Sequence, residues 1–232
     1  QPTCDGYLMY KGDDQATAKG DNAEIYTLGG RIAGTPAERW QYSAEAAYQW
    51  GRRNDATFTT SRDIAAYGAN AKLTYLFKDA RNNQLSLVGE YLSGDKRSSG
   101  KDEMFDVLWG RTPRISEVWA VALGQETGRN AQYNNLFRLG ASWSMAPTKS
   151  TTVSATYNAL FALEENPTRA AATNKLFSRD SSFRGHLLQL VVKHKFTKQL
   201  SGLLLAEYCP MGGYYTHTDD MTFLRAELTT TF

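Results

Sequence analysis

The feature that most constrains the fold of this chain is an alternation of apolar and polar side chains with a period of two residues. In the last twelve residues, 221–232, apolar or membrane-tolerant residues occupy every second position. They are Leu224, Ala226, Leu228, Thr230 and Phe232, and the positions between them hold Arg225, Glu227, Thr229 and Thr231. Because successive side chains of a strand point to opposite faces, this segment is predicted to form a strand with one apolar and one polar face.

The same alternation recurs along the chain and predicts an all-β protein. It is clearest in Trp40–Trp50, where the residues at even positions, from Trp40 and Tyr42 to Trp50, fall on one face. Eleven strands are read directly from the pattern: Cys4–Lys11, Glu24–Gly34, Trp40–Trp50, Ile64–Phe77, Leu85–Leu92, Glu117–Glu126, Asn135–Met145, Thr152–Leu163, Gly185–Phe196, Leu200–Tyr208 and Met221–Phe232.

Short and long connections alternate between these segments, as periplasmic turns and external loops do in outer-membrane barrels. If the last strand descends to the periplasm, Leu85–Leu92 and Glu117–Glu126 would both ascend, which consecutive strands cannot do. A descending strand is therefore inferred at Met104–Arg111. The total becomes twelve antiparallel strands, with both termini periplasmic.

Composition is compatible with a membrane barrel and excludes a helical membrane protein. The 232 residues suit one domain, residues 1–232, and 41% of them are hydrophobic. No run approaches the about 18 apolar residues that a membrane helix needs, whereas in a barrel only alternate residues meet lipid. The 13 Tyr, 10 Phe and 5 Trp would supply the aromatic girdles. A terminal Phe that closes an amphipathic strand resembles the signature of bacterial outer-membrane barrels.

In such a barrel the alternation places a set of charged residues on the lumen wall. The predicted pore-lining residues are Arg31, Lys72, Arg138, Lys193, Lys195 and Arg225, with Glu45, Glu90, Glu126, Glu207 and Glu227. A basic side chain facing lipid at the midplane would cost about 2–4 kcal/mol, so these residues are expected to point inward. Basic rings favour anions and carboxylates hold them in place, with Arg31, Arg138 and Arg225 as the leading candidates. The alternative is that all of them are merely solvated or paired.

Six stretches of the sequence resemble the alginate-export family of outer-membrane porins. They are YLSGDK (91–96), FDVLWGR (105–111), RLGASWSMAPTK (138–149), FRGHLLQ (183–189), LSGLLLAEY (200–208) and FLRAEL with the terminal TF (223–232). The resemblance implies integral outer-membrane localisation and passive diffusion of an anionic polysaccharide or other acidic solute through an arginine-lined lumen. Family members look longer, with an eighteen-stranded barrel. The twelve strands therefore either close alone or form the C-terminal part of a larger barrel.

Two other classes of function remain open at this stage. A structural anchor with a lumen plugged by loops would have the same strand pattern, because barrel diameter depends on strand number. A phospholipase-type enzyme would need a serine beside His186, which lies on the lipid-facing parity, and no such motif is present. We expect no enzymatic activity and no catalytic residues.

The remaining features point to no further chemistry. The loop residues His217, Asp219 and Asp220 could bind a divalent cation, but solvated side chains are the simpler interpretation, and no metal or cofactor is expected. The net charge of +2 gives no field for nucleic acid. The expected partners are outer-membrane lipid, lipopolysaccharide, the acidic solute and periplasmic export or assembly proteins. Cys4 and Cys209 are predicted at opposite rims as free thiols.

Overall fold

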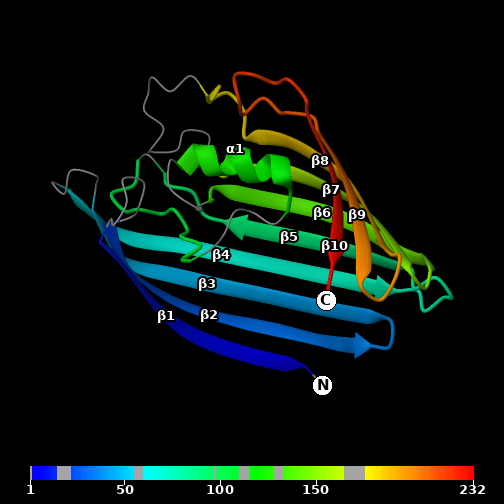
Figure 1. Cartoon of the computed structure of the whole chain (residues 1–232). Coiled ribbons are helices and arrows are strands. Elements are labelled where there is room, and N and C mark those ends of the chain that lie inside the picture. The colour runs from blue at the N-terminus through cyan, green and yellow to red at the C-terminus, as the bar shows by residue number, and fades with distance from the viewer. Residues whose placement is uncertain are drawn as a thin grey trace.

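Ten antiparallel strands form one continuous sheet in sequence order from β1 to β10 in the part of the chain that the structure describes (Figure 1). The computed structural model describes residues 2–14, 22–54, 60–96, 98–109, 115–127, 133–164 and 176–232. The strands are β1 (Thr3–Asp14), β2 (Asn22–Ala37), β3 (Trp40–Asn54), β4 (Ser61–Leu76), β5 (Gln84–Leu92), β6 (Leu136–Thr148), β7 (Thr151–Phe161), β8 (Phe183–Lys195), β9 (Leu200–Cys209) and β10 (Met221–Thr230). The helix α1 (Glu117–Thr127) interrupts this series between β5 and β6.

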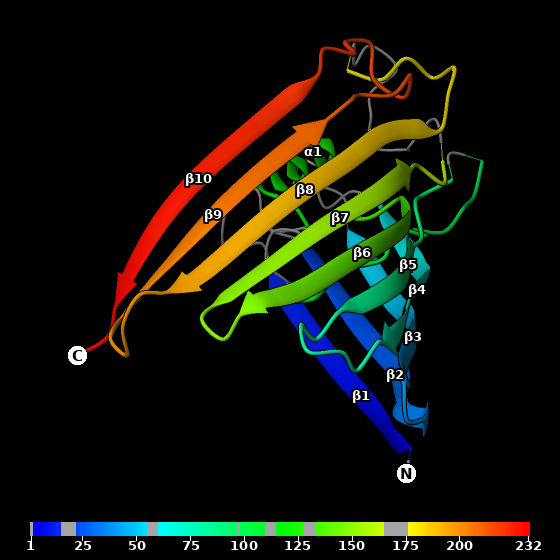
Figure 2. The same ribbon diagram turned by 90° about the vertical axis from the view of Figure 1, so that its right-hand side faces the viewer.

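The sheet is strongly curved, and its edge strands β1 and β10 border the same opening (Figure 2). The two edges are not paired with each other in the described chain. Short turns join β2 to β3, β4 to β5, β6 to β7 and β8 to β9, and we call the end of the sheet where they lie the turn end. The other end is the loop end. The first residues of β1 and the last of β10 also lie at the turn end, beside residues 33 and 200.

The convex outer face of the sheet is apolar and exposed. Leu8, Leu28, Leu204, Leu224 and Leu228 all expose more than half of their surface, with Leu224 at 81%. These are the alternate positions predicted to meet lipid, so the facing of the last strand is confirmed. No helix in the described ranges is long and apolar enough to cross a membrane.

Aromatic rings gather at both ends of the outer face. Near the loop end, rings contact one another across four strands: Tyr10 with Tyr26 at 5.0 Å between centroids, Tyr26 with Trp50 at 5.7 Å, and Tyr48 with Tyr67 at 5.0 Å. At the turn end, Trp40 packs on Tyr75, and Phe196 packs on His194. Two aromatic bands that flank an apolar band are the arrangement found in outer-membrane barrels.

Two of the twelve predicted strands are wrong. Glu117–Glu126 forms the helix α1, because the Ser116 hydroxyl caps it by accepting a hydrogen bond from the backbone N–H of Trp119 at 3.1 Å. Of Met104–Arg111, residues 104–109 are described and form no strand, and residues 110–111 lie outside the described ranges. The other ten predicted strands are confirmed, and the number of strands in the described chain remains even.

The connection between β5 and β6 lies on the concave face instead of adding strands. We call its described residues 93–96, 98–109 and 115–127 the inner segment. Trp119 and Leu123 of α1 are buried against Leu136, Leu187 and Tyr214, in a cluster at the loop end. Phe105 packs on a second cluster that includes Ile25 and Ala66 of the inner face. The protein core therefore lies inside the curve of the sheet, toward the loop end.

Candidate pore wall

Six polar residues form a row across the inner face, each directly opposite the next in the register of the sheet. Asp5 lies opposite Arg31, Arg31 opposite Glu45, Glu45 opposite Asn70, Asn70 opposite Glu90, and Glu90 opposite Arg138. The row crosses strands β1 to β6 at one level. Four of the predicted pore-lining residues, Arg31, Glu45, Glu90 and Arg138, are brought together in it.

The ends of the row differ in how firmly their charges are held. Nε of Arg138 donates to the Glu90 carboxylate at 2.9 Å, and Nη1 of Arg138 donates to Oδ1 of Asn158 at 2.9 Å. Arg31 lies 3.9 Å from Asp5, and the side chains of this pair are about half exposed. The arginine on β6 is therefore fixed by two partners, whereas Arg31 remains accessible to solvent.

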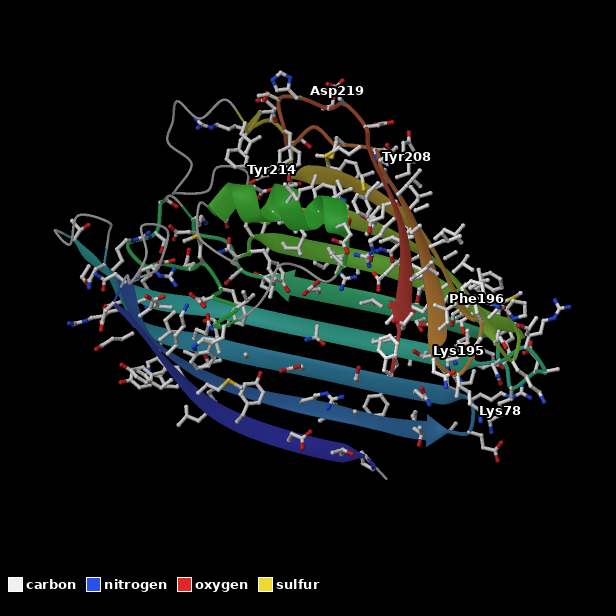
Figure 3. The ribbon with its side chains drawn as sticks, viewed as in Figure 1. Lys78, Lys195, Phe196, Tyr208, Tyr214 and Asp219 are labelled. Carbon is white, nitrogen blue, oxygen red and sulfur yellow. The ribbon has the colours of Figure 1, made fainter. Side chains whose placement is uncertain are left out.

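Three predicted lysines lie on the inner face toward the turn end. Lys72 of β4 and Lys193 and Lys195 of β8 are exposed, and none of them forms an ion pair within the described residues. Figure 3 shows Lys195 at the turn end, next to Phe196. A lysine without a carboxylate partner attracts a passing anion with its full charge. The field of a paired lysine is largely cancelled by the opposite charge of its partner.

The predicted residue Glu126 is not on a strand. It belongs to α1, and its carboxylate pairs with the guanidinium of Arg184 and accepts a hydrogen bond from the hydroxyl of Tyr215. Burial, followed by the charge of Glu126, raises the pKa of Tyr215 well above its ordinary value, so this hydroxyl stays protonated and donates. Glu126 therefore anchors the helix, and the prediction that it sits on a lumen-facing strand is wrong.

The predicted residue Glu207 lies on the inner face of β9 but is covered by the helix. Its carboxylate accepts hydrogen bonds from the Ser116 hydroxyl at 2.7 Å, from the backbone N–H groups at the start of α1, and from Nε2 of Gln189 at 2.7 Å. On β10, Arg225 pairs with Glu117 of α1 at 2.5 Å, and its Nε lies 3.7 Å from Glu227. These residues face inward as predicted, and most of them hold the inner segment.

A buried ion-pair network at the loop end was missed by sequence reasoning. Arg53 contacts Asp102 at 2.8 Å and Asp106 at 3.1 Å, and Lys11 contacts Asp106 at 3.2 Å. The side chains of Arg53, Asp102 and Asp106 are each 1% exposed. A third carboxylate, Asp95, pairs with Arg62 at 2.7 Å. Two features of the sequence could have predicted this network. Lys11 and Arg53 occupy inward-facing positions of their strands, and the charged loop between β5 and β6 contains aspartates.

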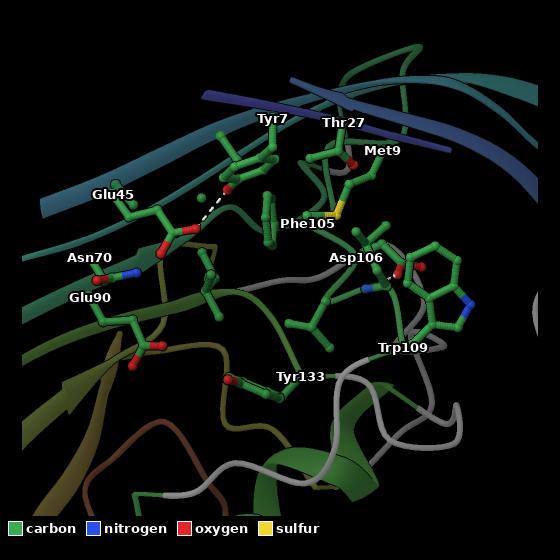
Figure 4. A pocket seen from close by; sticks show the side chains of 16 residues that line it. Tyr7, Met9, Thr27, Glu45, Asn70, Glu90, Phe105, Asp106, Trp109 and Tyr133 are labelled. Atoms are coloured by element: carbon green, nitrogen blue, oxygen red, sulfur yellow. Dashed lines mark hydrogen bonds between the residues drawn. The ribbon is translucent and has the colours of Figure 1, made fainter. Parts of the chain in front are cut away.

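A pocket of about 410 Å³ opens between the row and the inner segment (Figure 4). Glu45, Asn70 and Glu90 stand on its strand side, and Phe105 and Tyr133 lie opposite them. The Tyr7 hydroxyl donates to Oε1 of Glu45 at 2.7 Å. The inner segment thus narrows the concave side without filling it.

The other candidate residues have ordinary partners. Nδ1 of His186 hydrogen-bonds to the hydroxyl of Tyr157 at 2.9 Å, and the ring packs edge-on against Phe183, an aromatic setting that suits the interface with lipid. His217, Asp219 and Asp220 are exposed, and the described ranges contain no group of three or more ligands arranged to hold a metal. Cys4 is exposed and Cys209 buried, and both are free, as predicted.

A curved antiparallel sheet with an apolar, aromatic-banded outer face and a charged inner face defines the class of porin-like outer-membrane proteins. The family model described as "Alginate export" matches residues 2–226, so the chain belongs to the alginate export family. The sequence resemblance is thereby confirmed.

A solved structure described as a NanC porin in a rhombohedral crystal form is similar at a TM-score of 0.45 and 10% identity, over 100% of this chain and 99% of that one. None of the curated proteins matches the chain.

Proposed function

We propose that residues 1–232 act as one domain that forms the wall of an outer-membrane channel, through which an acidic solute such as an anionic polysaccharide diffuses passively. Membership of the alginate export family supports export of a polysaccharide of this kind. In this proposal the outer face contacts lipid and lipopolysaccharide, the turn end faces the periplasm, and the closed barrel has the sheet as its wall.

The observation that carries the proposal is the set of exposed lysines on the inner face. Lys72, Lys193 and Lys195 lie toward the turn end, where a solute leaving the periplasm would enter. The short turns at the same end add Arg39, Lys78, Arg81, Lys149 and Lys198, against Glu38 and Asp79. A basic mouth raises the local concentration of anions and speeds their entry. Beyond it, Arg31, which is about half exposed, provides a further positive group along the wall.

Reversal potentials in planar bilayers test this proposal. Lys72→Glu combined with Lys193→Glu should shift the channel from anion toward cation preference, because two exposed positive charges become negative. Arg138→Glu with Arg225→Glu should shift it less, because both arginines already have carboxylate partners. Lys149→Glu, a single change in the turn between β6 and β7 at the rim of the same mouth, should shift the reversal potential less than the double lysine variant. An unchanged reversal potential in the double lysine variant would overturn the proposal.

A second candidate function is a structural barrel whose lumen is closed. The packing of α1 and residues 98–109 against the inner face at the loop end favours it. Single-channel recordings distinguish the two candidates, because an open channel gives discrete conductance steps and a closed anchor gives none. Release of the inner segment, described in the Discussion, separates a permanent plug from a removable one.

A further inference from the structure

The pocket of Figure 4 has the size and the mixed lining of a small-molecule site. Its volume of about 410 Å³ falls within the range of about 300–1,000 Å³ that is usual for ligand pockets. It lies on the concave side at the level of the polar row, so a solute moving along the inner face would pass its mouth. The side chains that form the ion pairs described above leave this volume open.

One wall of the pocket consists of hydrogen-bonding groups in a line. Glu45, Asn70 and Glu90 come from three adjacent strands and lie directly opposite one another in register. One carboxylate oxygen of Glu45 is engaged by Tyr7 and one of Glu90 by Arg138, which leaves further acceptor positions on each carboxylate. The amide of Asn70 between them both donates and accepts. Such a line can accept several neighbouring hydroxyl groups at once.

The opposite wall is aromatic. The ring of Phe105 faces the row from the inner segment, and Tyr133 lines the pocket farther from the strands. Trp109, which is 66% exposed, stands at the edge of the pocket. Aromatic faces pack well on the aliphatic C–H faces of a flat, ring-shaped solute, while the rim of that solute remains free for hydrogen bonds.

The charge of the pocket excludes an anionic ligand at this point. Of its charged lining groups, Glu90 is neutralised by Arg138, and Asp106 by Lys11 and Arg53. Glu45 has a tyrosine donor and forms no ion pair within the described residues. No lysine, arginine or histidine is among the described residues that line the pocket. A carboxylate placed here would meet a like charge with no basic partner.

We propose that this pocket binds an uncharged pyranose residue, whose hydroxyl groups donate to Glu45 and Glu90 while its ring packs against Phe105. The inference rests on the proposed function and extends it: the turn-end lysines would attract the acidic residues of a polysaccharide, whereas this pocket would hold one of its uncharged residues by the hydroxyl groups. Binding at the pocket is measurable without transport, so the two proposals can fail separately.

The test is a fluorescence titration of the whole chain in detergent micelles with cellobiose, a neutral disaccharide. The probes for comparison are a disaccharide of two linked uronate residues and choline, an organic cation. Because Trp109 lines the pocket, cellobiose should change tryptophan emission, and Trp109→Phe should remove most of that change. Cellobiose should bind more tightly than the diuronate.

Two pocket variants and one control complete the design. Phe105→Ala should weaken cellobiose binding by about two- to tenfold, the loss of one aromatic contact. Glu45→Gln keeps the shape, so it remains informative if Phe105→Ala fails to fold, and it should weaken cellobiose binding while improving diuronate binding. Glu24→Gln makes the same chemical change on the outer face of β2, where Glu24 is exposed, and should leave binding unchanged.

Three results would overturn the inference. They are tighter binding of the diuronate than of cellobiose, binding of choline in place of the sugar, and equal cellobiose binding by the wild type, Glu45→Gln and Phe105→Ala. None of these depends on conductance. A channel that conducts anions but fails this titration would retain the proposed function and lose only the sugar pocket.

Discussion

Glu207 on β9 and Ser116 before α1 are 91 residues apart in sequence, and the Ser116 hydroxyl donates to the Glu207 carboxylate at 2.7 Å. The same carboxylate accepts the backbone N–H groups of Glu117 and Val118, both at 3.1 Å. A negative group at a helix N-terminus satisfies unpaired N–H groups and interacts favourably with the helix dipole. One wall residue therefore fixes where the helix begins and attaches it to the concave face of the sheet.

Replacement of this carboxylate should loosen the helix. Glu207→Gln keeps the volume but weakens charge-assisted hydrogen bonds, so we expect a loss of about 1–3 kcal/mol in the free energy of unfolding. Denaturant unfolding measures that loss, and emission from the buried Trp119 reports release of α1. The matched control is Glu227→Gln on β10, whose carboxylate lies 3.7 Å from Arg225 and is about half exposed. The control should change stability by less than about 0.5 kcal/mol, and equal effects of both variants would contradict the assignment.

The buried residues Asp102 and Asp106 should hold residues 98–109 against the inner face of the sheet, where this loop narrows the channel. In Asp102→Asn combined with Asp106→Asn, Arg53 and Lys11 keep their charges in a buried site and lose the carboxylate charges of Asp102 and Asp106. Loss of one partner of a buried ion pair costs about 3–5 kcal/mol, so residues 98–109 should detach from the wall. Single-channel conductance should rise, and trypsin should cut at Lys101 more readily than in the wild type.

The control for the loop is Asp63→Asn, which removes an exposed pair with Arg52 on the outer face. Exposed pairs contribute about 0–1 kcal/mol, so conductance and proteolysis should match the wild type. If the double aspartate variant conducts and resists trypsin as the wild type does, the network does not hold the loop in place.

The turn between β4 and β5 should be sensitive to acid through Asp79. Its carboxylate accepts hydrogen bonds from the backbone N–H groups of Asn83 at 3.0 Å and Arg81 at 3.1 Å, and from Nδ2 of Asn83 at 2.6 Å. These bonds, those from Asn83 first, lower the pKa of Asp79 below its ordinary value. A lowered folded-state pKa stabilises the protein above the unfolded-state pKa of about 3.9, and this contribution disappears as the pH falls through the folded-state value.

The corresponding measurement compares melting temperatures of the wild type and Asp79→Asn across pH. The wild type should be more stable near neutral pH, and the difference should disappear below the folded-state pKa of Asp79. Because Asp79→Asn keeps every other carboxylate of the chain, the pH dependence that those groups cause is common to both proteins and cancels in the difference. A difference that is the same at acidic and neutral pH would show that charge on Asp79 has no role.

The sequence predicted the strands correctly where alternation was long and failed between β5 and β6, where one segment was read as a strand without clear alternation and a second was added by parity. In Trp40–Trp50 the period of two extends over eleven residues, and the strand is found. In Glu117–Glu126 the apolar residues form a continuous run and do not alternate, so the pattern does not distinguish a strand from a helix, and in the structure Ser116 caps a helix. Met104–Arg111 was then added to restore parity. Both wrong strands lie between β5 and β6. Removing two consecutive strands leaves the alternating direction of all the other strands unchanged.

The sequence predicted which side of the sheet the pore-wall side chains face, but it did not predict which residues they pair with. Alternation alone places Arg31, Lys72 and Arg138 on the inner face, because side-chain direction is a local property of a strand. That Lys72 forms no ion pair with any described residue while Arg138 is held by Glu90 depends on register across separate strands. The pairing of Arg53 with Asp102 depends on a loop folding inward, and no local pattern encodes that contact.

The two edges of the sheet determine when this protein can enter a bilayer. β1 over twelve residues and β10 over ten each have one side of their backbone facing no further strand in the described chain. Water can solvate those amides and carbonyls, but hydrocarbon cannot, at a cost of several kcal/mol for each group left unmatched. In the proposed closed barrel, β1 and β10 must therefore pair before or during insertion, so the rate of this pairing, more than the stability of the sheet, should govern how fast the protein enters the membrane.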